Sequence, residues 1–251
     1  RPVPAAGGIL NWDLIEPAIR EKIYYDSQTA LVTLENTHNM HGGTVYPTKV
    51  VENICERAHA EGLRVHLDGA RIFNAAVALD ESVVDMTQKC DSVMFCLSKG
   101  LGAPVGSMLL GSREFIAKAR IGRKLLGGGM RQAGVLAAAG LIALEESPKR
   151  LHEDHANARH LAQELATLPG IVIDPKKVMT NIVVFDVQAT GKTAAEICEE
   201  IGRHGVLCGA TDKYAVRMVT HCDVDRAGIE KAVRAVESVS GKKTRASAKV
   251  S

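Results

Sequence analysis

Apolar and polar positions follow two different periods along the chain, which predicts strands and helices in turn. Four short apolar runs are predicted strands, at residues 30–35, 64–68, 91–98 and 105–110. A predicted helix over residues 48–61 gathers its apolar side chains on one face, namely Val51, Ile54, Cys55 and Ala58. The Ala- and Leu-rich residues 131–146 predict another helix. This alternation is typical of an α/β fold with a largely parallel sheet and helices on both faces.

The second half of the chain begins a new series of elements after Ser147-Pro148, which ends the preceding helix. A charged helix over residues 149–168 leads into a strand, a helix, two short strands and a last helix, over residues 181–187, 194–204, 206–208, 215–219 and 226–239. We therefore predict a large domain over residues 1–147, a smaller C-terminal α/β domain over 148–240, and a tail over 241–251. The opening residues 1–8 predict an extended connection.

Charge, aromatic content, apolar run length and cysteine spacing exclude several classes of function. The 251 residues carry a formal net charge of +2 and only 4% are aromatic, which argues against binding to nucleic acid or to an anionic membrane surface. No apolar run is long enough to span a bilayer, and no signal peptide precedes the first element. None of the six cysteines forms a CxxC pair, so we expect free thiols and a cytoplasmic protein. The histidines of the charged helix lack matching carboxylates, so no metal site is predicted.

Two charged residues lie where strands of a parallel sheet end, which is where ligands bind in such sheets. Asp68 closes the strand over residues 64–68, and Lys99 follows the strand over residues 91–98. A partly buried lysine amine suits Schiff-base chemistry, and a nearby carboxylate can keep a pyridine nitrogen protonated. By spacing alone, Asp68 could equally cap a helix and Lys99 could be a solvated surface charge. Pyridoxal phosphate (PLP) is therefore one interpretation among several at this point.

Five local sequences add specificity to that interpretation. They are ENTHN (35–39), HLDGARIFN (66–74), CLSKGLGAPVG (96–106), GGGMRQ (127–132) and RMVTH (217–221). In this order and spacing they resemble the low-specificity L-threonine aldolases, a family of PLP enzymes with the aspartate-aminotransferase-like fold. The resemblance covers the chain from about Pro4 to about Val239. It implies a PLP-binding large domain, a small amino-acid substrate, and cleavage of L-threonine or L-allo-threonine to glycine and acetaldehyde.

The resemblance also implies roles for particular residues. Lys99 matches the Schiff-base lysine, and Asp68 matches the aspartate on the pyridine nitrogen. Arg71 matches an arginine near the cofactor hydroxyl and the substrate carboxylate, which Arg217 would also bind. His38 matches a histidine near the substrate's β-hydroxyl, where His38 or a water that it orients would act as the base.

Basic residues around the glycine run match groups that approach the site from a neighbouring subunit, Arg131 toward the cofactor and Lys124 toward the substrate. The family resemblance therefore implies a homo-oligomer, a dimer or a tetramer. Other interpretations stay open: His38 could only cap its turn, His41 is a second local histidine, and Lys124 and Arg131 could be solvated.

Relative to the family pattern, the chain is expected to lack an N-terminal part that supplies the phosphate loop and a ring-stacking histidine. Two alternatives to an active aldolase follow. The chain could be a catalytically impaired fragment that acts only as an oligomerising or folding module, or it could be another PLP-dependent amino-acid lyase. An assay distinguishes the aldolase from the other lyase: the aldolase forms glycine from threonine, whereas the lyase releases pyruvate or ammonia.

Overall fold

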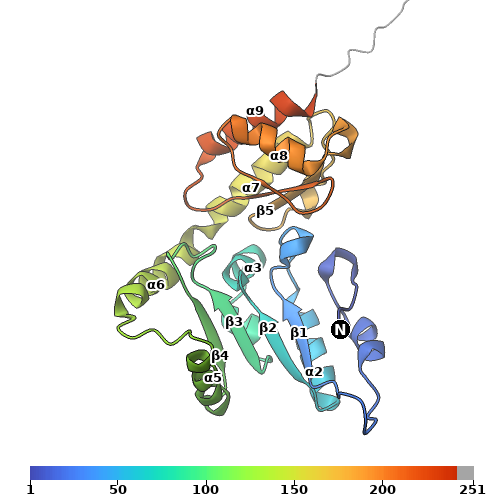
Figure 1. Cartoon of the computed structure of the whole chain (residues 1–251), viewed down its shortest axis with the longest axis vertical. Helices are drawn as coiled ribbons and strands as arrows, with labels where there is room; N and C mark the ends of the chain where they lie inside the picture. Colours follow the sequence, from blue (N-terminus) through green and yellow to red (C-terminus); the bar gives the residue numbers. More distant parts are fainter. Residues whose placement is uncertain (242–251) are drawn as a thin grey trace, which may run out of the picture. The chain divides into compact units, whose positions relative to one another are not determined.

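The computed structural model describes residues 1–241; of the predicted tail, residues 242–251 lie outside the described residues. The chain divides into two compact units (Figure 1). The first is Arg1–Asp154 and the second starts at His155, so the division falls inside helix α7 (Leu151–Leu165). No helix within residues 1–241 combines the length and the apolar character needed to cross a bilayer.

A four-stranded sheet forms the centre of the first unit. Its order is β1-β2-β3-β4, with the bounds Leu31–Glu35, Arg64–Asp68, Ser92–Cys96 and Ser107–Gly111. The first three strands run parallel, and β4 is antiparallel to β3. The predicted strands over 30–35, 64–68, 91–98 and 105–110 are each found to within a few residues, and the largely parallel sheet is confirmed.

The first unit contains the helices α1 (Trp12–Ile15), α2 (Thr48–Ala60), α3 (Ile72–Leu79), α4 (Val83–Thr87), α5 (Arg113–Leu125) and α6 (Gly134–Glu146). Among them, α2 packs against β2 and α5 against β4 (Figure 1). Helix α2 buries the predicted face, because its apolar residues recur at helical spacing toward the sheet. The pattern of apolar and polar positions did not predict α3, α4 or α5. Helix α3 is apolar on nearly every side, and α4 is little more than one turn. The predicted start of α6 at residue 131 is wrong, because Gln132 has a φ of 50°, outside the helical range.

Up to residue 241, the second unit pairs a small antiparallel sheet with helices. The sheet order is β5-β7-β6, over Ile182–Asp186, Ala215–Val219 and Gly209–Ala210. The predicted strand over 206–208 is therefore wrong by a few residues, as the pairing with β7 begins at Gly209. Helices α7, α8 (Ala194–Arg203) and α9 (Arg226–Ser240) cover the sheet. Short 3-10 turns lie at Ala6–Gly8, Glu16–Ala18, Asn39–His41, Ser147–Arg150, Pro175–Lys177 and Gln188–Thr190.

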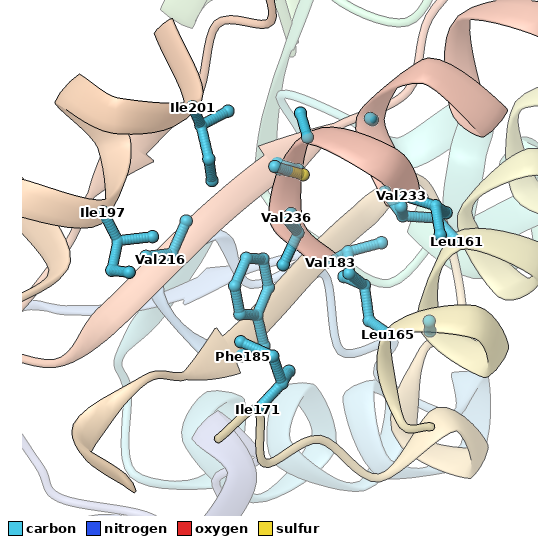
Figure 2. Close-up of a cluster of buried hydrophobic side chains, with 14 of the residues drawn as sticks. Leu161, Leu165, Ile171, Val183, Phe185, Ile197, Ile201, Val216, Val233 and Val236 are labelled. Atoms are coloured by element: carbon cyan, nitrogen blue, oxygen red, sulfur yellow. The ribbon is translucent and has the colours of Figure 1, made fainter. Parts of the chain in front are cut away.

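An apolar cluster holds the second unit together (Figure 2). Phe185 of β5 lies at its centre and is 1% exposed, and Ile197 of α8 and Val236 of α9 are fully buried around it. Each such side chain contributes roughly 1.5–3 kcal/mol by leaving water. The core thus fixes β7, the strand that carries Arg217, against β5.

Candidate active site

The two residues that opened the PLP interpretation lie at the same edge of the sheet. Asp68 is the last residue of β2, and its register partners are Glu35 of β1 and Met94 of β3. Lys99 follows Cys96, where the parallel neighbour β3 ends. Because parallel strands end at a common edge, Glu35, Asp68 and Lys99 gather there. Sequence reasoning assigned no role to Glu35, although it too ends a strand.

A cavity of about 710 Å³ borders this edge on the β1 side. Asp68, Glu35 and His38 contribute to its lining, as do His41 and Tyr46. The Asp68 side chain is held in place, because its Oδ1 accepts a hydrogen bond from the Ala70 N–H at 3.0 Å. A carboxylate is therefore presented to a space large enough for a small ligand.

Glycines follow both Asp68 and Lys99 because the backbone is tightly packed there. A Cβ on Gly69 would lie 2.9 Å from the Met94 carbonyl oxygen. A Cβ on Gly100 would lie 2.5 Å from Oδ1 of Asn74, a buried side chain on α3. Lys99 itself is exposed, not partly buried as the Schiff-base interpretation expects, and its carbonyl accepts a hydrogen bond from the Gly102 N–H at 2.9 Å. The amine is thus free to reach a ligand while the backbone beneath it is fixed.

His38 has a carboxylate on one side and a second imidazole on the other. Its Nδ1 lies 3.8 Å from Oε2 of Glu35, and its ring meets that of His41 edge to face at a centroid distance of 4.7 Å. The buried Nδ1 has no hydrogen-bond partner among residues 1–241. Burial lowers the pKa of His38 below its usual range and His41 lowers it further, while Glu35 opposes the shift. His38 is therefore neutral at neutral pH and can accept a proton.

The N-terminal segment packs against this histidine pair. A Cβ on Gly8 would lie 2.6 Å from the His41 ring and 2.8 Å from the His38 ring. The Tyr46 hydroxyl donates to the Gly8 carbonyl at 3.0 Å and accepts from the Leu10 N–H at 2.8 Å. Burial raises the pKa of Tyr46, which keeps its hydroxyl protonated for this bridge. The positions of His38 and His41 thus depend on residues before β1.

A chain of hydrogen bonds links Arg71 to Glu35. Arg71 is 9% exposed, and its Nη1 donates to Oδ1 of Asn39 at 3.3 Å. The Asn39 N–H in turn donates to Oε1 of Glu35 at 2.9 Å, which leaves Oε2 on the side of His38. Asn39 had no predicted role either. The quoted sequence ENTHN contained both residues, but only tertiary contacts show how they connect.

The remaining predicted site residues lie elsewhere. Lys124 near the end of α5 and Arg131 after the glycine run are both exposed, and neither lines the cavity described by residues 1–241. Arg217 lies on β7 in the second unit, opposite Val184 of β5. Its Nε atom is buried with no hydrogen-bond partner in the part of the chain described. The structure thus places Asp68, Lys99, His38 and Arg71 in the first unit. Asp68 and His38 line the cavity of about 710 Å³, whereas Lys99 and Arg71 are not among its lining residues.

The residues of the first unit fit the ring and aldehyde end of PLP. Asp68 offers a fixed carboxylate to a pyridine nitrogen, and Lys99 offers an exposed amine. Gly69 and Gly100 let a flat ring approach the backbone. The buried Nδ1 atom of His38 has no hydrogen-bond partner in the described chain. The Asp68 carboxylate and the Lys99 amine match the ring nitrogen and the aldehyde of the cofactor, but no residue is assigned to its phosphate.

Comparison with known proteins agrees with this geometry. The sequence profile of the beta-eliminating lyase family matches residues 1–189. Low-specificity L-threonine aldolase 1 of Arabidopsis thaliana is 42% identical over 218 residues, which cover 85% of this chain and 61% of that enzyme. The chain thus spans less than two thirds of that relative's length.

Solved structures share the fold. Threonine aldolase of Leishmania major aligns with a TM-score of 0.74 and 18% identity, over 95% of this chain and 69% of its own. A PLP-dependent aminotransferase of Streptococcus suis 89-1591 aligns with a TM-score of 0.71 and 17% identity, over 93% of this chain and 61% of its own. The chain belongs to the beta-eliminating lyase family, and its resemblance to the low-specificity L-threonine aldolases is confirmed.

Proposed function

We propose that this chain carries the catalytic edge of a PLP-dependent aldolase that cleaves L-threonine and L-allo-threonine to glycine and acetaldehyde. The observation that carries the proposal is the placement of Asp68 and Lys99 at the ends of neighbouring parallel strands, each followed by an obligatory glycine. The name of the Arabidopsis relative supports the substrate class.

PLP, when bound, supplies a protonated pyridinium ring that withdraws electrons from the substrate's Cα. Lys99 would hold its aldehyde carbon through the exposed amine. Asp68 would keep the ring nitrogen protonated, a role for which its carboxylate is already fixed by the Ala70 N–H. A carboxylate held in this way orients the ring without moving during the reaction.

His38 would remove the proton from the substrate's β-hydroxyl. Its lowered pKa leaves the imidazole neutral and able to accept that proton. Glu35 would orient the ring, because the Asn39 N–H fixes one carboxylate oxygen and the other faces Nδ1 of His38. That arrangement favours a proton on Nδ1 and leaves Nε2, on the opposite side of the ring, as the base.

Arginines would bind the substrate carboxylate. Arg71 already lies at the edge, held by Asn39, and Arg217 would add a planar two-donor contact from β7. We further propose a homo-oligomer, dimer or tetramer, in which Lys124 and Arg131 of one copy reach the site of another. Six free thiols support a cytoplasmic location.

Borohydride trapping tests the proposal. Purified protein is incubated with PLP, reduced, digested with trypsin and searched by mass spectrometry for a phosphopyridoxyl group on Lys99. Lys89→Ala should keep the adduct, because Lys89 pairs on the surface with Glu56. An adduct on another lysine would overturn the assignment of Lys99. Protein that stays colourless and untrapped after incubation would support the impaired-fragment alternative instead.

The family profile favours one second candidate, a β-eliminating lyase acting on another amino acid. That reaction also needs Lys99 and Asp68, so the trapping experiment does not distinguish it. Glycine released from threonine supports the aldolase. Pyruvate and ammonia released from a β-substituted amino acid, with no glycine from threonine, would establish the lyase.

A further inference from the structure

Two cysteines lie together in the first unit, away from the candidate active site. Cys55 is on helix α2 and is fully buried, whereas Cys90, just before β3, is partly exposed. Their Sγ atoms are 3.9 Å apart. Cys90 also lines a separate cavity of about 220 Å³, together with Asp91. A small molecule can therefore reach Cys90 but not Cys55.

The backbone on both sides of Cys90 is anchored. The Cys90 N–H donates to the Thr87 carbonyl at 2.9 Å, and the Asp91 N–H donates to the Val65 carbonyl at 3.0 Å. Cys55 lies on the face of α2 that packs toward the sheet. The two sulfurs are thus held as neighbours by secondary structure on each side, so a bond between them requires little chain movement.

We propose that Cys55 and Cys90 form a site of reversible oxidation that closes to a disulfide when the protein meets a hydroperoxide. In the first step the Cys90 thiolate attacks the peroxide, which becomes an alcohol or water, and Cys90 becomes a sulfenic acid. In the second step the Cys55 thiolate attacks the Cys90 sulfur and expels hydroxide. Overall two thiols lose two electrons and two protons, and the peroxide takes up both.

The order of the steps follows from accessibility and from the shared proton. The hydrogen bond from Cys90 lowers the pKa of Cys55, and that same contact, with burial, raises the pKa of Cys90. Cys55 is therefore the better thiolate but is sheltered, which suits the second step. Cys90 is reachable but mostly protonated, so the first step is slow and needs excess peroxide.

The disulfide would tie α2 to the start of β3. Both attachment points lie near the amino ends of β2 and β3, the opposite edge from Asp68 and Lys99. Closing the loop between residues 55 and 90 restricts the unfolded chain, so the oxidised protein should be more stable. The site would protect the sheet without touching the catalytic edge.

Peptide mapping after treatment of the Cys96→Ser variant with hydrogen peroxide tests the proposal. That background is needed because trypsin leaves Cys90 and Cys96 in one peptide, residues 90–99, while Cys55 is in residues 50–57. We expect these two peptides to be linked with a loss of two hydrogens, and dithiothreitol to separate them. We also expect the midpoint of thermal unfolding to rise by roughly 5 °C. Absence of the linked pair under full peroxide treatment would overturn the proposal.

Single serine variants in the same background test the order of the steps. Cys55→Ser should accumulate a sulfenic acid on Cys90 that dimedone labels. Cys90→Ser should leave Cys55 unlabelled, since its sulfur is sheltered. Dimedone on Cys55 in the second variant would contradict the assignment of Cys90 as the entry point. Far-ultraviolet circular dichroism confirms that each variant is folded before treatment.

Discussion

The two edges of the same parallel sheet use charged side chains in opposite ways. At the amino edge, Asp91 accepts hydrogen bonds from Nη1 of Arg64 at 2.6 Å and from the Val65 N–H at 2.8 Å. Nε2 of His59 lies 2.8 Å from the same carboxylate. Every contact here joins one part of the chain to another, so these charges stabilise the fold.

At the carboxyl edge the polar side chains are held in place, but some of their atoms lack hydrogen-bond partners in the described chain. Nδ1 of His38 is buried without a hydrogen-bond partner in the described chain, and Glu35 stops 3.8 Å short of it. Asp68 is fixed by Ala70 and borders a cavity. A buried polar atom without a partner costs stability, so the unmatched Nδ1 of His38 beside the cavity indicates a site prepared for a ligand.

Lys99→Ala should give the largest effect on the carboxyl edge. Without the amine, the cofactor has no covalent attachment, and threonine cleavage should fall on the order of 10³-fold or more. Stability should change by less than about 0.5 kcal/mol, because the Lys99 side chain is exposed. Glycine formation and urea unfolding measure the two quantities. A large loss of stability would show that Lys99 belongs to the structural class of Asp91.

Asp68→Asn should reduce cleavage by roughly 10²-fold while the trapped adduct on Lys99 persists. The amide oxygen can still accept the Ala70 N–H, but it cannot keep a pyridine nitrogen protonated. Steady-state rates and borohydride trapping on the same preparation check both parts. Full activity in this variant would remove Asp68 from the proposed mechanism.

Asp91→Asn should act on stability and spare the reaction. The pKa of Asp91 falls to about 2, since hydrogen bonds from Arg64, Val65 and His59 outweigh burial, which alone would raise it. Because the folded pKa is lowered, the Asp91 carboxylate stabilises the fold at pH values above its unfolded pKa near 3.9. That stabilisation is lost as pH falls from about 4 to about 2. After allowance for solvent screening, the variant should lose about 1–2 kcal/mol at pH 7.

Urea unfolding at pH 7 and at pH 3 checks that prediction. The difference between the two proteins should shrink at pH 3, because Asp91 is then mostly protonated in the unfolded chain but still ionised in the folded one. A change in threonine cleavage larger than twofold in folded Asp91→Asn would contradict the separation of the two edges.

Glu35→Gln should give the smallest effect. Loss of the negative charge disfavours imidazolium, so the pKa of His38 should fall further and the acidic limb of the rate profile should move to lower pH. The amide oxygen keeps the bond from Asn39, while the amide N–H faces Nδ1 and favours a proton on Nε2. We expect a loss in rate of roughly 2- to 10-fold. Nitrogen-15 shifts of the His38 ring report the tautomer without relying on activity, with Glu61→Gln as the control.

The candidate site at the carboxyl edge was predictable as far as single residues mark it. Asp68 and Lys99 follow recognisable strands, so parallel pairing brings them to one edge without further information. Glu35 and Asn39 were not predictable as partners of His38 and Arg71, because their contacts depend on the turn over Asn39–His41 and on side-chain rotamers. The same limit applies to Cys55 and Cys90, whose separation of 3.9 Å reflects packing of a helix on a sheet.

The sequence by itself determined the strands of the first unit, the parallel core of its sheet and the residues that end those strands, since apolar periodicity and glycine placement are local properties. Tertiary structure alone decided which charged side chains form hydrogen bonds within the fold and which border the candidate ligand site. Asp91 and Asp68 both lie at ends of strands of the same sheet. Asp91 accepts hydrogen bonds from Arg64 and Val65 and contacts His59, whereas Asp68 is held by the Ala70 N–H beside the candidate active-site cavity. That distinction depends on the groups that distant segments bring to each edge, and no local pattern encodes it.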